Sequence, residues 1–219
     1  MEEYQTALGV FSPDGRLIQV EYAQHASNQG VTIVLQCLEG SIQIAYEKRN
    51  SNPLLISASK IHEVDLDRHF CLIFSGFKPD SLCVVDEVIN IVHNFKYTTS
   101  EDISLDILAR KISEYKQIFT VDSSMRPYGL RTVLFGIEQG ISRIFVIETD
   151  GNYAEYTQCS LGFKNEVCNS FLETHHEENS AFKALSEVVQ MDHKKVVGYS
   201  LDQNGLREFS SNEIEQLMK

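Results

Sequence analysis

Short stretches of apolar and β-branched residues recur along the chain, and neighbouring stretches enclose turns rich in glycine, aspartate or asparagine. The stretches lie at residues 31–36, 42–46, 61–64, 71–74, 132–135, 144–147, 153–156, 196–201 and 206–209. Short segments of this kind, joined by tight turns, are typical of antiparallel sheets. The pattern therefore predicts strands that pair as hairpins and meanders.

A second pattern, with apolar residues three or four positions apart, predicts helices between the strands. One pair of helices follows Pro79, with apolar faces containing Leu82, Val85, Val88, Val92 and then Leu105, Leu108, Ile112, Tyr115, Phe119. Another pair contains Val167, Phe171, Leu172 and then Phe182, Leu185, Val188, Val189. Thr99 with Asp102 is the predicted cap of the second helix, and Ser210 with Glu213 predicts a capping box for a terminal helix.

The amino-terminal region predicts a turn and a short helix ahead of the first strand. Residues 12–15, Ser-Pro-Asp-Gly, form the turn, and Leu17, Val20 and Ala23 follow at helical spacing. The helix is expected to begin near Arg16 and to end before Gly30.

The order of strands, two helices, strands, two helices and strands predicts an α+β fold. Because both faces of each sheet must be covered, the economical arrangement is a four-layer αββα sandwich, with two antiparallel sheets packed together and flanked by helix pairs. We divide the chain into residues 1–30, which form a tail, a turn and a helix, and residues 31–219, which form a single sandwich domain.

Composition narrows the classes of partner. The chain has 219 residues, and 31 acidic against 19 basic side chains give it a formal charge of -12. This charge would repel phosphate backbones and argues against nucleic acid as a partner. No apolar run approaches the roughly 18 to 20 residues that span a bilayer, and the acidic start is unlike a secretory leader. The five scattered cysteines are expected to be reduced thiols inside the cell.

The run from Tyr4 to Gly30 resembles the amino-terminal signature of proteasome alpha-type subunits. The matching residues are Tyr4, Phe11, Ser12, Pro13, Gly15, Leu17, Gln19, Val20, Glu21, Tyr22 and Ala23. Segments 74–77, 126–129 and 149–153 agree with this family over the rest of the chain, and the whole is most similar to the fourth of its seven eukaryotic alpha types. The resemblance implies the fold of amino-terminal nucleophile (Ntn) hydrolases and a place in the cytoplasm and nucleus.

The resemblance also implies that this chain is not itself catalytic. Active beta subunits use a threonine whose hydroxyl attacks and whose free α-amine acts as the base. The matching position here is Val31, with Glu47 and Lys60 near the positions of the acidic and lysine partners. Thr32 carries a hydroxyl, but its nitrogen is an amide and cannot act as the base. We therefore expect no catalytic residue, no cofactor and no metal; His175 and His176 fit a polar loop better than a metal site.

The family implies three sets of binding residues and a set of protein partners. Tyr4, Pro13 and Tyr22 would form the gate cluster, although Gln5 replaces the aspartate usual there and Tyr22 could instead pack in the core. Leu17, Val20 and Glu21 would lie at the interface with other alpha subunits of a seven-membered ring, which also docks on beta subunits. Lys60, Gly30, Gly76 and Phe77 would bind the carboxyl terminus of a regulatory ATPase or other activator, with the lysine ammonium holding the chain-end carboxylate.

Two other functions are compatible with the sequence. An active threonine peptidase of the same fold would require cleavage before a nucleophile. A free-standing adaptor domain would use the sandwich for binding alone.

Overall fold

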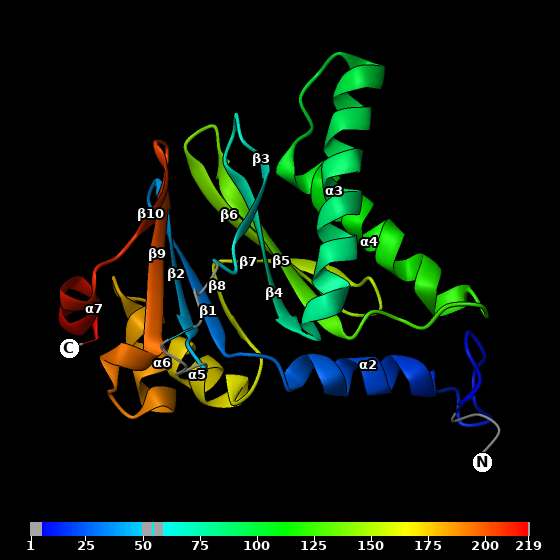
Figure 1. The fold of residues 1–219 in the computed structure, drawn as a ribbon, viewed down its shortest axis with the longest axis horizontal. Helices are drawn as coiled ribbons and strands as arrows, with labels where there is room; N and C mark the ends of the chain where they lie inside the picture. The colour runs from blue at the N-terminus through cyan, green and yellow to red at the C-terminus, as the bar shows by residue number, and fades with distance from the viewer. Residues whose placement is uncertain (1–5, 50–53, 55–58, 219) are drawn as a thin grey trace.

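The computed structural model describes residues 6–49, 54 and 59–218. Two five-stranded antiparallel sheets pack face to face (Figure 1). In spatial order, the first contains β10 (Gly205–Glu208), β9 (Val196–Asp202), β2 (Ser41–Glu47), β1 (Ile33–Leu38) and β8 (Gln158–Leu161). The second contains β3 (His62–Asp65), β4 (Phe70–Gly76), β5 (Leu130–Glu138), β6 (Ile141–Ile147) and β7 (Tyr153–Tyr156).

Helices cover the outer face of each sheet. The β3–β7 sheet is covered by α3 (Lys78–Thr99) and α4 (Leu105–Val121). The other sheet is covered by α5 (Asn165–Leu172), α6 (Ser180–Val189) and α7 (Ser211–Leu217), with a short 3-10 turn at His193–Lys195. The helix α2 (Ile18–Asn28) extends from one end of the sandwich in Figure 1. The predicted four-layer αββα fold is confirmed.

The alternation of side chains along the strands explains the layers. In β1, Ile33 and Leu35 point into the core between the sheets, whereas Val34 between them packs against α5 and α6. In β5, Val133 faces the same central core, and Leu134 faces α3 and α4. Because successive strand residues point to opposite faces, apolar residues at every position bury both sides of each sheet.

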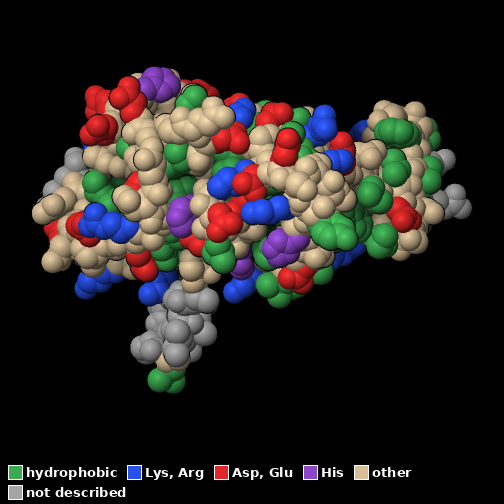
Figure 2. Space-filling view, turned by 90° about the horizontal axis from the view of Figure 1, so that it is seen from above, with side chains coloured by type: hydrophobic (Ala, Val, Ile, Leu, Met, Phe, Trp, Pro, Cys, Tyr) green, Lys and Arg blue, Asp and Glu red, His purple; other side chains and the backbone are tan. Residues whose placement is uncertain are grey.

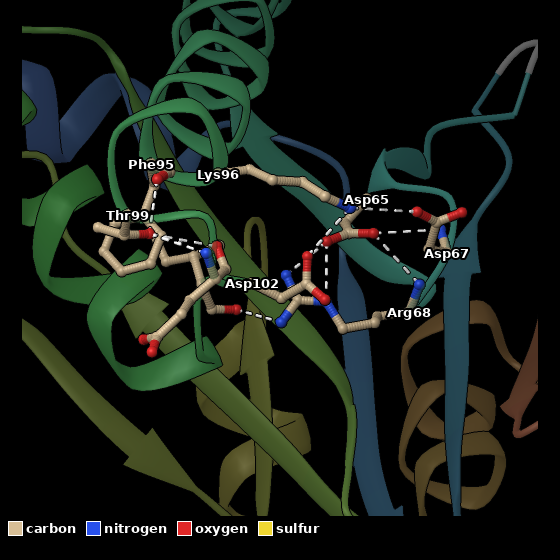
Figure 3. A network of polar contacts seen from close by, with 9 residues as sticks. Asp65, Asp67, Arg68, Phe95, Lys96, Thr99 and Asp102 are labelled. Carbon is tan, nitrogen blue, oxygen red and sulfur yellow. Dashed lines mark hydrogen bonds and ion pairs between the residues drawn. The ribbon is translucent and has the colours of Figure 1, made fainter.

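Two local predictions about the helix pair 78–121 were wrong. Thr99 does not cap α4; it lies in the last turn of α3, where its hydroxyl donates to the carbonyl of Phe95 (Figure 3). The cap is Ser104, whose hydroxyl accepts from the amide of Ile107. Leu82 does not belong to the buried face of α3, since it is 60% exposed. The predicted capping box of Ser210 and Glu213 is confirmed.

The strand β8 was missed, and it forms an edge of the first sheet beside β1. Only four residues long, it places Cys159 and Leu161 in the central core while Gln158 and Ser160 alternate with them. Because the run is so short and half of its residues are polar, its alternation of polar and apolar residues is too brief to identify a strand from the sequence.

Polar contacts fix the end of the sandwich opposite α2. Arg68 in the β3–β4 turn binds Asp65 and reaches the carbonyl of Ile103 beyond α3 (Figure 3). Lys96 of α3 lies 3.1 Å from Asp102 and 3.7 Å from Asp67. These contacts join the turn to the connection between α3 and α4.

The surface carries charges of both signs. Acidic and basic side chains are interspersed over the face shown in Figure 2. The described cysteines are all free thiols, and Cys71, Cys159 and Cys168 are buried, whereas Cys83 on α3 is exposed. No helix within the described ranges has the length and apolar character needed to cross a bilayer.

Lys116 of α4 is a fully buried lysine that sequence analysis did not identify. Its ammonium donates to the carbonyls of Leu130 and Ile147 at 3.0 and 3.2 Å and to the hydroxyl of Thr132 at 3.3 Å. Burial lowers the pKa of Lys116 to about 7, against the opposing influence of the nearby carboxylates. These acceptors attach α4 to the ends of β5 and β6.

We predict that Lys116→Met lowers the free energy of unfolding by about 1–3 kcal/mol, because the substitution leaves buried acceptors without a donor. Urea unfolding followed by circular dichroism measures the effect. The matched control is Lys111→Met in the same helix, where the half-exposed side chain pairs with Glu114 at the surface. Equal stability of the two variants would contradict the anchoring role of Lys116.

Candidate functional site

The junction between α2 and the first strand is held by close backbone contacts. A Cβ added to Gly30 would lie 2.2 Å from the amide nitrogen of Gly76, so both positions approach more closely than any side chain allows. The hydroxyl of Ser75 lies 3.3 Å from the carbonyl of Ser27 and 3.2 Å from that of Val31. The end of α2 is therefore attached to the end of β4.

The other sheet contacts the same junction through residues 162 and 163. Gly162 has a φ of +89°, and a Cβ there would lie 2.1 Å from the carbonyl oxygen of Val31. The amide of Phe163 donates to the carbonyl of Gly30 at 3.0 Å. Residues 30 and 31 thus lie between the ends of both sheets, which fixes the chain where it enters the sandwich.

Thr32 has no free functional group in this arrangement. It is fully buried, and its hydroxyl donates to the carbonyl of Phe163. Its nitrogen is a peptide amide, and the preceding Val31 offers no nucleophile. The interpretation of Thr32 as a structural residue is confirmed, and the chemistry of an amino-terminal nucleophile has no group here to carry it.

A largely apolar pocket of about 300 Å³ lies beside this junction. It brings together three of the four residues predicted to bind an activator: Lys60, Gly76 and Phe77. Gly30 does not line the pocket but supports it from behind, through its contact with Gly76. The lining residues are Val31, Ser59, Lys60, His62, Phe74, Gly76, Phe77, Lys78, Ser81, Leu82 and Leu130.

Lys60 is the more buried of the two lysines, Lys60 and Lys78, that line this pocket. Its Nζ lies 5.1 Å from the centre of the Tyr46 ring, and no described carboxylate is within ion-pairing distance of it. Burial lowers the pKa of Lys60 to about 8, and the nearby cations Arg49 and Lys78 act in the same direction. An incoming carboxylate would supply the counter-charge that this site lacks. The pocket therefore fits an anion attached to an apolar body.

The predicted gate residues lie in the turn before α2, on α2 itself or outside the described residues. Pro13 is exposed in the turn before α2, where the amide of Gly15 donates to the carbonyl of Ser12. Tyr22 is 51% exposed, so the alternative that it packs in the core of this chain is wrong. Tyr4 lies outside the described residues. The cluster of these three residues stays a prediction.

The predicted ring-contact residues divide between two faces of α2. Val20 is 8% exposed and lies with Ala23 on the buried face of α2, which packs on β4 and β5 of its own chain. Its burial is therefore explained inside this chain, and a direct contact with a neighbour stays a prediction. Leu17 is half-buried at the helix start, and Glu21 is paired with Arg16 at the surface, 2.7 Å from its Nε.

Sequence analysis missed the ion pair of Asp80 and Arg126 beside the pocket. Asp80 lies in the first turn of α3 and accepts from both terminal nitrogens of Arg126 at 2.8 Å and from the amide of Gly129 at 3.0 Å. Burial alone would raise the pKa of Asp80, but these hydrogen bonds outweigh it and lower the pKa. No local pattern signals this pairing, because the two residues belong to distant segments.

The two adjacent histidines lie in the loop between α5 and α6. His175 stacks on Phe171 with ring centres 4.1 Å apart, and Nδ1 of His176 lies 2.7 Å from the side-chain nitrogen Nε2 of Gln158. Within the part of the chain that the structure describes, no three His, Cys, Asp or Glu side chains are arranged to hold a metal ion.

Comparisons with known proteins agree along nearly the whole chain. A family model described as proteasome subunit matches residues 27–195, and one for the N-terminal signature of A-type proteasome subunits matches residues 4–26. A proteasome alpha subunit of Saccharolobus solfataricus is 31% identical, covering 98% of this chain and 94% of its own length. A protein of the same name from Saccharolobus islandicus is 30% identical over 93% of this chain and 90% of its own. A proteasome alpha type-7-like subunit of Macaca fascicularis is 30% identical over 97% and 90%, respectively.

We predict that the Lys60 amine becomes nucleophilic at lower pH than the amine of Lys96. Burial lowers the pKa of Lys60 to about 8, whereas the hydrogen bond to Asp102 raises the pKa of Lys96. Trace acetylation at a series of pH values, read by peptide mass spectrometry, compares the two lysines in one sample. Coincident pH profiles would contradict the environment described for Lys60.

Proposed function

This chain belongs to the alpha branch of the proteasome subunit family, and from that membership we propose that it forms part of a gated entrance and offers a docking pocket to activators. It is a non-catalytic alpha-ring subunit, and the peptide-cleaving chemistry belongs to beta subunits. It assembles with other proteasome subunits. Membership of this family disfavours the alternative of a free-standing adaptor.

The observation that carries the non-catalytic role is the state of residues 31 and 32. Val31 occupies the position where an active subunit would need its nucleophile, and its carbonyl is held by Ser75. The Thr32 hydroxyl is occupied by the carbonyl of Phe163. A threonine peptidase would need both a hydroxyl and a free amine at this point, so the geometry disfavours that alternative.

We propose that the pocket around Lys60 receives the carboxyl terminus of a regulatory ATPase or another activator. The ammonium of Lys60 without a described carboxylate partner, the apolar ring of Phe77 and the half-buried Gly76 in the pocket lining support this assignment. A carboxylate would bind Lys60, and an apolar side chain just before the chain end would fill the remaining volume. Gly30 acts indirectly by allowing Gly76 to lie where it does.

The finer assignments are proposals that rest on the sequence. Residues 1–30 would contribute the gate and ring contacts, through Tyr4, Pro13, Tyr22, Leu17, Val20 and Glu21. We propose the fourth of the seven eukaryotic alpha types on the similarity of segments 11–15, 74–77 and 126–129. We place the protein in the cytoplasm and nucleus, to which its free, mostly buried thiols are suited because those compartments are reducing.

We predict that Lys60→Ala weakens activator-stimulated peptide entry by about tenfold or more in half-maximal activator concentration, since a charge-assisted contact is worth roughly 1.5–3 kcal/mol. The measurement is hydrolysis of a fluorogenic peptide by assembled particles at increasing activator concentration. Native mass spectrometry should show that these particles are complete.

The control is Lys194→Ala, which removes an exposed lysine near β9. Stimulation that is unchanged by Lys60→Ala would remove this residue from the site. If the native chain failed to assemble into a particle with the other subunits, its role as a ring subunit would be overturned.

A further inference from the structure

Phe77 forms a wall shared by two hollows on either side of it. One is the Lys60 pocket; the other, of about 330 Å³, lies between α2 and residues 126–129. The second hollow is lined by Gln19, Tyr22, Ala23, Ala26, Phe77, Arg126, Pro127 and Gly129. The Phe77 side chain is 51% exposed, so packing inside the core does not fix its position.

Arg126 contacts the exposed ring of Phe77, which core packing leaves unsupported. Its guanidinium carbon lies 5.7 Å from the centre of the Phe77 ring, at a distance typical of cation–π pairs. The same guanidinium donates to both carboxylate oxygens of Asp80 at 2.8 Å. A fork held at two points cannot rotate freely, so the position of Asp80 sets the position of the cation over the ring.

The backbone completes this arrangement. The amide of Phe77 donates to the carbonyl of Gly129 at 2.9 Å, and the amide of Gly129 donates to Asp80 at 3.0 Å. Asp80 is 6% exposed, and its own amide donates to the carbonyl of Phe77 at 3.2 Å. Phe77, Asp80, Arg126 and Gly129 thus form a closed set of contacts, which we name the wall clamp.

We propose that Arg126, held by Asp80, is a positioning residue for activator binding: the wall clamp fixes Phe77 as the apolar side of the Lys60 pocket. This inference rests on the proposed docking of a chain-end carboxylate at Lys60. Arg126 acts on the apolar part of the ligand through Phe77, while Lys60 acts on its charge.

Because Lys60 and Arg126 act on different parts of the ligand, two ligands can test their roles separately. Assembled particles containing this chain are titrated with a short fluorescent peptide that has a leucine near its end and a free terminal carboxylate, and with its carboxamide counterpart. Arg126→Ala should weaken binding of both peptides by the same factor, about threefold to tenfold, because it loosens the wall that both contact. Lys60→Ala should weaken the carboxylate peptide alone.

Further variants separate positioning from general damage. Arg126→Lys retains a cation near Phe77 and should restore part of the affinity. With Phe77→Ala already present, Arg126→Ala should have little further effect, since the ring through which it acts is gone. Arg143→Ala is the matched control: it breaks a partly buried ion pair with Glu155, 2.7 Å long, on β6 and outside the lining of either hollow, and should leave both affinities unchanged.

The outcomes distinguish this inference from the proposed function. If the native particle binds both peptides equally and Lys60→Ala changes neither, the docking function itself is overturned, and the clamp with it. If Lys60→Ala behaves as stated but Arg126→Ala changes neither affinity, only the clamp is overturned. A loss confined to the carboxylate peptide in Arg126→Ala would also overturn it, because Arg126 would then act as a charge on the ligand.

Discussion

The close approach of three backbone segments at the base of the sandwich is the constraint on which the rest of the structure depends. Gly30, Gly76 and Gly162 leave room for the end of α2, the end of β4 and the segment after β8 to meet around Val31. Ser75 and Phe163 then satisfy the carbonyls exposed there. Because any side chain at these positions would collide with backbone, which cannot rotate away as a side chain does, the meeting point tolerates little change.

The same junction shapes both the position where a nucleophile would be needed and the pocket that we propose for docking. It holds residue 31 as an internal peptide unit and occupies the hydroxyl of Thr32, so no nucleophile with a free amine is available. It also brings Gly76 and Phe77 beside Lys60 in the lining of a largely apolar pocket, which contains Lys78 as well. One local arrangement therefore underlies both the non-catalytic role and the docking pocket that we propose.

The layers of the fold could be predicted because they depend on the spacing of apolar residues along the chain. In β1, for example, Ile33 and Leu35 face one side of the sheet and Val34 faces the other. Lys60, Gly76 and Phe77 could be named through a family resemblance, but their meeting in one pocket could not be calculated from spacing. Thr99 was mistaken for a cap because several polar residues compete there, and only the left-handed turn at Ser100 decides where α3 ends. The pairing of Asp80 with Arg126 and the burial of Lys116 depend on tertiary packing, which local patterns do not encode.

The most direct measurement of the central claim compares Gly162→Ala with Gly40→Ala. Both glycines have positive φ values, 89° and 73°, so both variants carry similar backbone strain. Only Gly162 has neighbours in the way, whereas a Cβ on Gly40 meets nothing within 4 Å. The account predicts that Gly162→Ala loses at least about 2 kcal/mol more unfolding free energy than Gly40→Ala in urea titration. Equal losses would mean that the junction around Val31 does not constrain the fold.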